Sequence, residues 1–437
     1  MKIKLFIFLV WGLSVNQSFA QTIDTARIND YIDYIVKENQ DIGSISIFKN
    51  GNEIYNRSFG QNHIKDLEFN ENTKYYIGSI SKLFTATMIW QLIEKKQLHL
   101  KDKLAKFFPK VPNSKEINIK NLLEHSSGLG DYVIKNDTLY YWLKEPRTEK
   151  EILSEIRRQG VLFQPGDSVS YSNTGYYLLA KILEKKHHTN YGKILKEYIT
   201  EPLHLKNTFS IENHPKNIFN SYKFSKGKWT KVKEFYFPNV VGLGDIVSTP
   251  TDLNKFITQL FNYKLLSKKT IEMMKPIVGK EVFGRGLMFI PFHDHISYGH
   301  AGDTYGSHSS VVYEPKNKLS VAFALNGARY SRNNFAIGLY NKIYGIEFNY
   351  PKFVDPQILK QYIGIYSSPD FPLKITIAKH GSLLTAQATG QSEFPLQPIG
   401  QSKFQFKRAG IKIEFKPEKN LLIIKQGGSE DILKKGS

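Results

Sequence analysis

The stretch Gly78-Ser79-Ile80-Ser81-Lys82 places a hydroxyl group and an amine one helical turn apart. Apolar residues recur at intervals of three and four after Ser79, so the spacing predicts that Ser79 lies near the N-terminal end of a helix with one buried face. The unpaired N–H groups of that turn and neighbouring cations lower the pKa of an amine. Lys82 can then take the Ser79 proton, and the Ser79 N–H can bind an oxyanion. Together they suit nucleophilic acyl transfer.

The Ser-x-x-Lys spacing is weak evidence when it stands alone. It occurs twice more, as Ser46/Lys49 in a predicted strand and as Ser225/Lys228 in a predicted polar loop. The ordinary alternative for each serine is a helix N-cap beside a solvated lysine. The surrounding elements must therefore decide between the three pairs.

The pattern up to about residue 350 predicts an α+β domain in which strands come first and last and helices lie between them. Asn50-Gly51 indicates a β-hairpin turn. The predicted helices cover 25–40, 79–96, a short piece at 121–125, 147–160, 174–187, 189–200, 249–260 and 332–343. The predicted strands are Ser44–Lys49, Glu53–Phe59, Gly286–Ile290, Ile296–Gly302, Ser309–Tyr313 and Leu319–Asn326.

A second domain is predicted from about residue 351 to 437. After a short helical piece at 355–362, apolar residues alternate with period two in five segments, which predicts a small antiparallel barrel or sandwich. These segments are Leu373–Ile377, Leu383–Ala388, Lys403–Lys407, Ile411–Phe415 and Leu421–Ile424. This region contains no recognisable catalytic pattern.

Residues 1–20 are predicted to be a secretory signal peptide, followed by the first domain from 21 to 350. Lys2 and Lys4 precede the apolar run Leu5–Leu13, and Ser18-Phe19-Ala20 matches a cleavage site. We expect a secreted, periplasmic protein without a membrane anchor. The chain has no cysteine, which excludes disulfides, a lipoprotein anchor and a thiol nucleophile.

The formal net charge of +20 does not by itself indicate a nucleic-acid partner. The lysines are scattered over predicted helices and hairpins, and no nucleic-acid-binding motif occurs. His293-Asp294-His295 has two imidazoles but no third ligand at a suitable spacing, so we expect neither a metal site nor a cofactor.

Two further patterns follow Ser79-Ile80-Ser81-Lys82 in the chain, namely Tyr171-Ser172-Asn173 and His300-Ala301-Gly302. In this order they resemble the serine β-lactamase and penicillin-binding-protein superfamily, nearest to class C β-lactamases, D-alanyl-D-alanine carboxypeptidases and related esterases. The resemblance covers about 28–345. It includes the segments 122–129, Pro165-Gly166 and 248–253.

The resemblance implies a role for each matching residue. Ser79 is the acylated nucleophile, Lys82 its proton partner and Tyr171 a second acid/base. Asn173 binds Lys82 or a substrate amide, and the N–H groups of Ser79 and Asp303 form the oxyanion hole. Gly302 lets the substrate backbone approach the strand edge.

One position departs from the family pattern. Class C β-lactamases usually carry Lys-Thr-Gly where this chain has His300-Ala301-Gly302, so a permanent cation and a hydroxyl that could bind a substrate carboxylate are missing. His300 retains a hydrogen-bonding or charged role, or is structural. His125 follows Glu124 in a Ser/Gly turn and is expected to be structural, since no Gly-x-Ser-x-Gly elbow occurs.

Two functions follow. The first is an exported serine hydrolase that acts on D-amino-acid peptides, small esters or amides, or β-lactams, with cell-wall peptide as a candidate partner. The second is an envelope-binding or regulatory protein on the same fold with little turnover. The intact Ser79, Lys82, Tyr171 and Asn173 favour the first.

Overall fold

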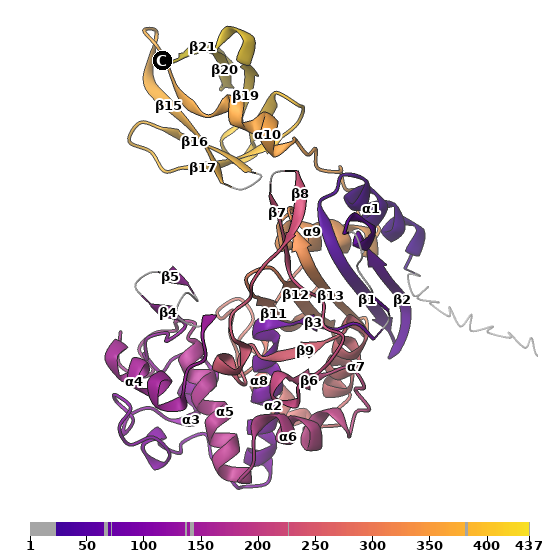
Figure 1. Cartoon of the computed structure of the whole chain (residues 1–437), viewed down its shortest axis with the longest axis vertical. Coiled ribbons are helices and arrows are strands. Elements are labelled where there is room, and N and C mark those ends of the chain that lie inside the picture. The colour runs from indigo at the N-terminus through magenta and orange to yellow at the C-terminus, as the bar shows by residue number, and fades with distance from the viewer. Residues whose placement is uncertain are drawn as a thin grey trace, which may run out of the picture.

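The computed structural model describes residues 23–64, 69–70, 72–135, 138–139, 144–225, 227–380 and 383–436. These residues form a helix-flanked antiparallel sheet and a separate closed β-barrel, as Figure 1 shows. The predicted α+β class with a C-terminal all-β domain is confirmed. The predicted signal peptide lies outside the described residues, and the boundaries at 21 and 351 stay predictions. Of the described helices, none has the length and apolarity needed to cross a bilayer.

The central sheet has the strand order β10-β11-β12-β13-β1-β2, and the hairpin β7–β8 joins it beside β13. Its first strand, β1, pairs with its last long strand, β13, so the two ends of the domain meet in the sheet. The predicted Asn50-Gly51 turn links β1 and β2, and both residues have positive φ, at 53° and 86°. The bounds are β1 Asp41–Lys49, β2 Asn52–Phe59, β7 Tyr222–Ser225, β8 Lys228–Lys231, β10 Met288–Phe289, β11 Tyr298–Asp303, β12 His308–Glu314 and β13 Leu319–Ala328.

Helices cover both faces of this sheet (Figure 1). On one face α1 (Thr25–Lys37) and α9 (Arg332–Ile343) pack together over a core that includes Ile45 and Phe323. On the other face lie α2 (Ser81–Glu94), α7 (Pro250–Phe261) and α8 (Lys268–Met274), with Phe84 stacked on Phe256 at 3.9 Å between ring centroids.

Helix α2 is buried on nearly all sides, which agrees with the predicted largely buried helix, although its apolar spacing indicates only one buried face. The reason is the helical insert, which packs against the side of α2 that faces away from the sheet. The insert contains α3 (Ile119–Leu123), α4 (Glu149–Gln159), α5 (Asn173–His187) and α6 (Tyr191–Leu195), the last continued by a π-helical turn at Lys196–Thr200. Short strands outside the main sheet are β3 Tyr75–Tyr76, β4 Ile134–Lys135, β5 Thr138–Leu139, β6 Phe209–Ser210 and β9 Ile246–Ser248.

The C-terminal part is a closed barrel of β14–β21, preceded by α10 (Pro356–Leu359). The five predicted segments correspond to β15, β16, β18, β19 and β20, while β14, β17 and β21 escaped prediction. Those three strands are short or rich in polar residues and proline, so alternation is hard to see. The bounds are β14 Gly364–Ser368, β15 Phe371–His380, β16 Leu383–Ala388, β17 Phe394–Pro398, β18 Lys403–Phe406, β19 Ile411–Lys416, β20 Leu421–Gln426 and β21 Ser429–Lys435.

Candidate active site

Ser79 lies in a 3₁₀ turn, Gly78–Ile80, that leads directly into α2. The Lys82 Nζ lies 2.9 Å from the Ser79 Oγ and donates a hydrogen bond to it. Gly78 has φ of 50°, and a Cβ there would approach the Asp303 N to 2.8 Å, so the turn that presents Ser79 requires glycine. The predicted pairing of hydroxyl and amine at the start of the helix is therefore present in the structure.

The Lys82 ammonium is completely buried among the insert and α2. Its second hydrogen bond goes to the Leu243 carbonyl at 3.0 Å, and it lies 5.0 Å from the centre of the Tyr171 ring. Burial lowers the pKa of Lys82 from 10.5 to about 7, although the Asp131 carboxylate opposes that shift. Lys82 can therefore exchange a proton with Ser79 near neutral pH.

A tight turn at 242–245 holds the carbonyl that accepts from Lys82. The buried Asp245 carboxylate accepts the Gly242 N–H at 2.7 Å, and the Thr85 hydroxyl donates to the Gly242 carbonyl at 2.6 Å. Because Thr85 lies one turn beyond Lys82 on α2, this network ties the turn to the helix that carries the amine. The turn thus fixes the position of Lys82 from the side opposite Ser79.

Tyr171 packs against His125, with the ring centroids 4.5 Å apart. The His125 Nδ1 accepts the backbone N–H of Ser172 at 3.2 Å, so the neighbour of Tyr171 is held directly. Burial, together with the charge of Lys82, keeps the pKa of His125 well below its usual value. His125 is therefore a neutral imidazole that supports the loop of Tyr171. This is a structural role of the kind that the sequence predicted for it.

Asn173 begins α5 but points to a partner that the sequence did not predict. Its amide Nδ2 donates to the Asp131 Oδ2 at 2.8 Å, and its backbone N–H reaches the same oxygen at 3.3 Å. Its described hydrogen bonds thus go to Asp131 and not to Lys82. Burial raises the pKa of Asp131, opposed by these donors and by the Lys82 charge. The only signal for Asp131 in the sequence is its position three residues after Gly128, in the turn that follows α3.

The third predicted pattern, His300-Ala301-Gly302, lies on β11, which passes close to Ser79. A Cβ on Gly302 would lie 1.9 Å from the Ile77 carbonyl oxygen and 2.8 Å from the Ser79 N. The close approach at Gly302 in the structure is that of the protein's own backbone, and the approach of a substrate backbone to this edge stays a prediction. The backbone N atoms of Ser79 and Asp303 both lie at this contact, and their role as an oxyanion hole stays a prediction.

The Asp303 side chain contacts His308 and Arg332. It accepts from the His308 Nδ1 at 2.7 Å and from an Arg332 NH1 at 2.6 Å. Burial raises the pKa of Asp303, but the hydrogen bond from His308 and the charge of Arg332 outweigh it, and the net shift is downward. The Asp303 carboxylate is therefore ionised and held by these two side chains.

His300 is buried, and its Nδ1 lies 2.7 Å from the Ala301 carbonyl. Since a carbonyl accepts, this nitrogen carries the proton and the Nε2 is left as an acceptor. Burial, together with the charge of Lys82, lowers the pKa of His300 to about 3. This pKa favours a neutral His300 at physiological pH, so of the roles left open for it a hydrogen bond or a structural role fits better than a positive charge.

The rival pairs are separated from this site by their secondary structure. Ser46 lies on β1, where its hydroxyl donates to Glu53, and Ser225 and Lys228 flank the turn of the β7–β8 hairpin. Ser46 and Lys49 are three apart on one strand and so face opposite sides of it, whereas Ser225 and Lys228 pair across the hairpin, and neither pair lies at the start of a helix. His295 contacts the Glu314 carboxylate at 2.9 Å, and no group of metal-ligating side chains occurs among the described residues.

Comparison with known proteins places this geometry in a family. A family model described as Beta-lactamase matches residues 32–340. The putative penicillin-binding protein PbpX of Bacillus subtilis is 28% identical over 329 residues, which is 74% of this chain and 80% of that protein. A teichoic acid D-alanine hydrolase of Staphylococcus aureus is 28% identical over 230 residues, which is 52% of this chain and 56% of that protein.

The fold similarity extends into the barrel. The octameric penicillin-binding protein homologue from Pyrococcus abyssi matches 94% of this chain and 100% of its own, with a TM-score of 0.70 and 25% identity. The family match covers the sheet, the insert and all three sequence patterns. The chain therefore belongs to the Beta-lactamase family and is a serine hydrolase.

Proposed function

We propose that this protein is an exported hydrolase that forms an acyl-enzyme on Ser79 and releases D-amino acids or their derivatives. The observation that carries the proposal is the 2.9 Å contact between the Ser79 hydroxyl and the Lys82 amine, whose pKa lies near 7. Export rests on the sequence of residues 1–20, and the periplasm or cell envelope is the proposed location.

Acylation begins when neutral Lys82 takes the Ser79 proton and the Ser79 Oγ attacks the substrate carbonyl. The oxyanion of the tetrahedral intermediate accepts hydrogen bonds from the N–H groups of Ser79 and Asp303. Tyr171, held by His125, protonates the leaving amine or alcohol directly or together with Lys82. Expulsion of the leaving group produces the ester between Ser79 and the acyl group.

Deacylation repeats these steps with water as the nucleophile. The Tyr171 phenolate that remains after acylation accepts the proton of the water, and the same two N–H groups stabilise the second oxyanion. The Ser79 Oγ then leaves as the hydroxyl, with its proton returned by Lys82. The scheme needs no metal or cofactor, because every proton is exchanged between named side chains.

The proposed substrates are D-amino-acid peptides first, then small esters and amides, and β-lactams last. The D-alanine hydrolase among the relatives supports a D-amino acyl group. Neutral His300 speaks against efficient β-lactam turnover, because it cannot form an ion pair with a substrate carboxylate. A neutral amide or ester on the carbonyl side suits this environment better.

The test is intact-mass analysis after brief exposure of wild type and Ser79→Ala to a D-alanyl ester, and separately to a penicillin. We expect turnover of the ester, a mass increase that depends on Ser79, and at most slow penicillin acylation. Turnover that persists in Ser79→Ala would overturn the proposal. Wild-type protein that neither reacts nor turns over would favour the low-turnover envelope-binding alternative.

A further inference from the structure

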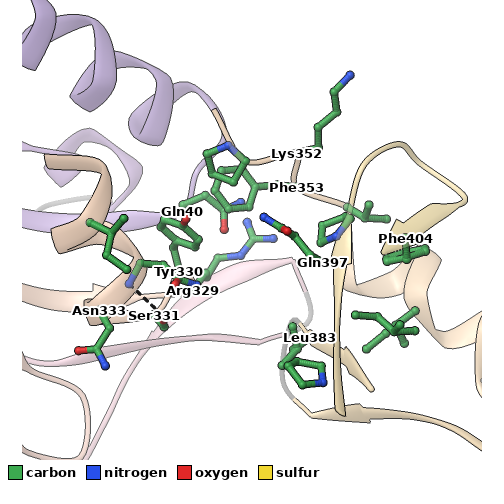
Figure 2. A pocket seen from close by; sticks show the side chains of 18 of the residues that line it. Gln40, Arg329, Tyr330, Ser331, Asn333, Lys352, Phe353, Leu383, Gln397 and Phe404 are labelled. Carbon is green, nitrogen blue, oxygen red and sulfur yellow. Dashed lines mark hydrogen bonds between the residues drawn. The ribbon is translucent and has the colours of Figure 1, made fainter. Parts of the chain in front are cut away.

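A cleft of about 1260 Å³ lies between the sheet domain and the barrel, and the mechanism above does not use it. We refer to it as the junction cleft. One wall consists of the end of β13 and the start of α9 (328–334) with the linker 351–354, and the other of barrel residues 393–398 and 404–408. Figure 2 shows Arg329 and Tyr330 on one side of this space and Gln397 and Phe404 on the other.

The described walls of the junction cleft are basic. Five lysines and arginines line them, against the two acidic residues Asp303 and Glu393. Asp303 is already paired with Arg332, and Glu393 accepts from the Thr385 hydroxyl. The basic residues are Arg329, Arg332, Lys352, Lys407 and Arg408, so cations come from both walls.

Lys407 and Arg408 are the cations best placed to meet a ligand. Both are exposed on the barrel wall, and neither side chain forms an ion pair within the described part of the chain. Below them the barrel presents an apolar surface that includes Phe394 and Phe406, stacked at 4.7 Å. Such a mixture of apolar floor and basic rim is typical of ligand-binding clefts at domain junctions.

The junction cleft also reaches the candidate active site through one residue. Asp303 lines the cleft with its side chain, while its backbone N lies within 2.8 Å of where a Cβ on Gly78 would be. Arg332 contacts both the Asp303 carboxylate and, at 3.5 Å, the Gly302 carbonyl. The junction cleft and the candidate active site thus share Asp303, whose backbone lies next to the turn that carries Ser79.

We infer that the junction cleft binds a phosphate-bearing chain that carries the acyl group hydrolysed at Ser79. Its volume exceeds the range of about 300 to 1,000 Å³ that suits single small molecules, so an extended ligand fits better. Each bridging phosphate of such a chain is tetrahedral, stays anionic at neutral pH and has two unbridged oxygens that can accept from Arg or Lys, so successive phosphates can meet the cations of both walls. That the chain carries the acyl group rests on the proposed function; the binding does not.

Titration calorimetry of the full chain with linear inorganic polyphosphate tests the inference. We expect binding that weakens at least tenfold in the double variant Lys407→Gln with Arg408→Gln. The matched control replaces Lys412 and Lys419, which are exposed on the barrel but do not line the cleft, and should bind like wild type. Ser79→Ala should also bind like wild type, so this result is independent of whether Ser79 is the nucleophile.

Three results would overturn the inference. They are absence of polyphosphate binding, equal weakening in the cleft variant and in the control variant, and equal affinity for a polyglutamate of the same charge. A kinetic comparison adds a second measurement. The KM for a D-alanyl ester of glycerol phosphate should lie below that for D-alanyl glycerol in wild type, and this difference should vanish in the Lys407/Arg408 variant while kcat stays unchanged.

Discussion

The Asn173 amide donates to the Asp131 carboxylate at 2.8 Å, and that carboxylate is buried close enough to Lys82 to influence its proton affinity. Asn173, the first residue of α5, is thus connected to the turn that contains Asp131, and the Asp131 carboxylate that connects them lies near the Lys82 amine. Asp131 links the second sequence pattern to the first. It acts on Lys82 through its charge and on Asn173 through a hydrogen bond.

Replacing Asp131 with Asn should make Lys82 easier to deprotonate. The Asp131 charge raises the pKa of Lys82, so its loss should move the acidic limb of the kcat/KM profile for a D-alanyl ester down by about one pH unit. The rate plateau should also fall roughly tenfold, because Asn173 is held less firmly. A pH profile from 5 to 9 measures both effects.

Asp167→Asn is the matched control for this variant. Asp167 is exposed on the loop before Tyr171, and its replacement makes the same change in formal charge. Its pH profile should match that of wild type. An acidic limb that stays in place in Asp131→Asn, or moves upward, would contradict the assigned electrostatic role.

Lys82 should control the activity around neutral pH. Since its pKa is about 7, kcat/KM should rise as pH increases through 7 and Lys82 loses its proton. Lys82→Arg keeps a cation that cannot deprotonate in this range, so it should lower kcat/KM by roughly 10³-fold at every pH between 6 and 9. A variant that keeps a wild-type profile would exclude Lys82 as the base.

Lys82 should also lower the stability of the folded protein at neutral pH. Its pKa in the folded protein lies below the 10.5 of an ordinary lysine, so between pH 7 and 10.5 the unfolded chain binds more protons and stability rises with pH. Lys82→Met should therefore raise the free energy of unfolding at pH 7 by a few kcal/mol, roughly. The gain should shrink by pH 9.5 in urea unfolding, and a gain that does not depend on pH would contradict this origin.

The sequence predicted the Ser79 turn, Lys82 and the strand with Gly302 because each belongs to a local pattern. Periodicity predicted most of the sheet and helices, since apolar spacing records which face is buried. For α2, periodicity indicated one buried face of a largely buried helix. It could not show that the insert covers the opposite side, because that burial depends on contacts between distant segments.

Asp131 and the charge state of His300 could not be predicted in the same way. A carboxylate after a turn has no periodicity, and its partner Asn173 follows 42 residues later. The pKa of His300 depends on its burial beside Lys82, which no spacing reveals. In the barrel, strands β14 and β21 pair across the closure, so their existence depends on the chain returning to its start.

Gly302→Ala should unfold or inactivate the enzyme. The added Cβ would lie 1.9 Å from the Ile77 carbonyl, a backbone atom that cannot rotate away, so β11 must move from the Ser79 turn. We expect a loss of about 3 kcal/mol or more in stability. In any folded fraction, acylation should fall at least about 100-fold, because the Asp303 N–H is displaced.

Gly400→Ala serves as the matched glycine control. The Cβ it introduces would lie 3.5 Å from the Lys403 side chain, an ordinary contact in the barrel. Its melting temperature and acylation rate should equal those of wild type. If Gly302→Ala were as stable and active as Gly400→Ala, the close packing of β11 on the Ser79 turn would be refuted.

His300 should remain a neutral imidazole throughout the working range of the enzyme. Its pKa of about 3 and the proton that its Nδ1 shares with the Ala301 carbonyl predict ¹⁵N chemical shifts of a protonated Nδ1 and an unprotonated Nε2 from pH 5 to 8. Nitrogen-detected histidine spectra, assigned with His300→Gln, measure this directly. A titration above pH 5, or the opposite tautomer, would contradict it.

A neutral His300 also predicts weak selection for substrates with a free carboxylate next to the scissile bond. For D-alanyl-D-alanine and its C-terminal amide, wild-type kcat/KM values should differ by less than about threefold, since His300 contributes no charge. His300→Lys adds an amine in the same place, and it should shift the ratio toward the free acid to the extent that burial leaves the amine protonated. A wild-type preference above about tenfold for the free acid would show that a cation other than His300 binds the carboxylate, and the charged groups that influence His300 are Lys82 and, more weakly, Arg332.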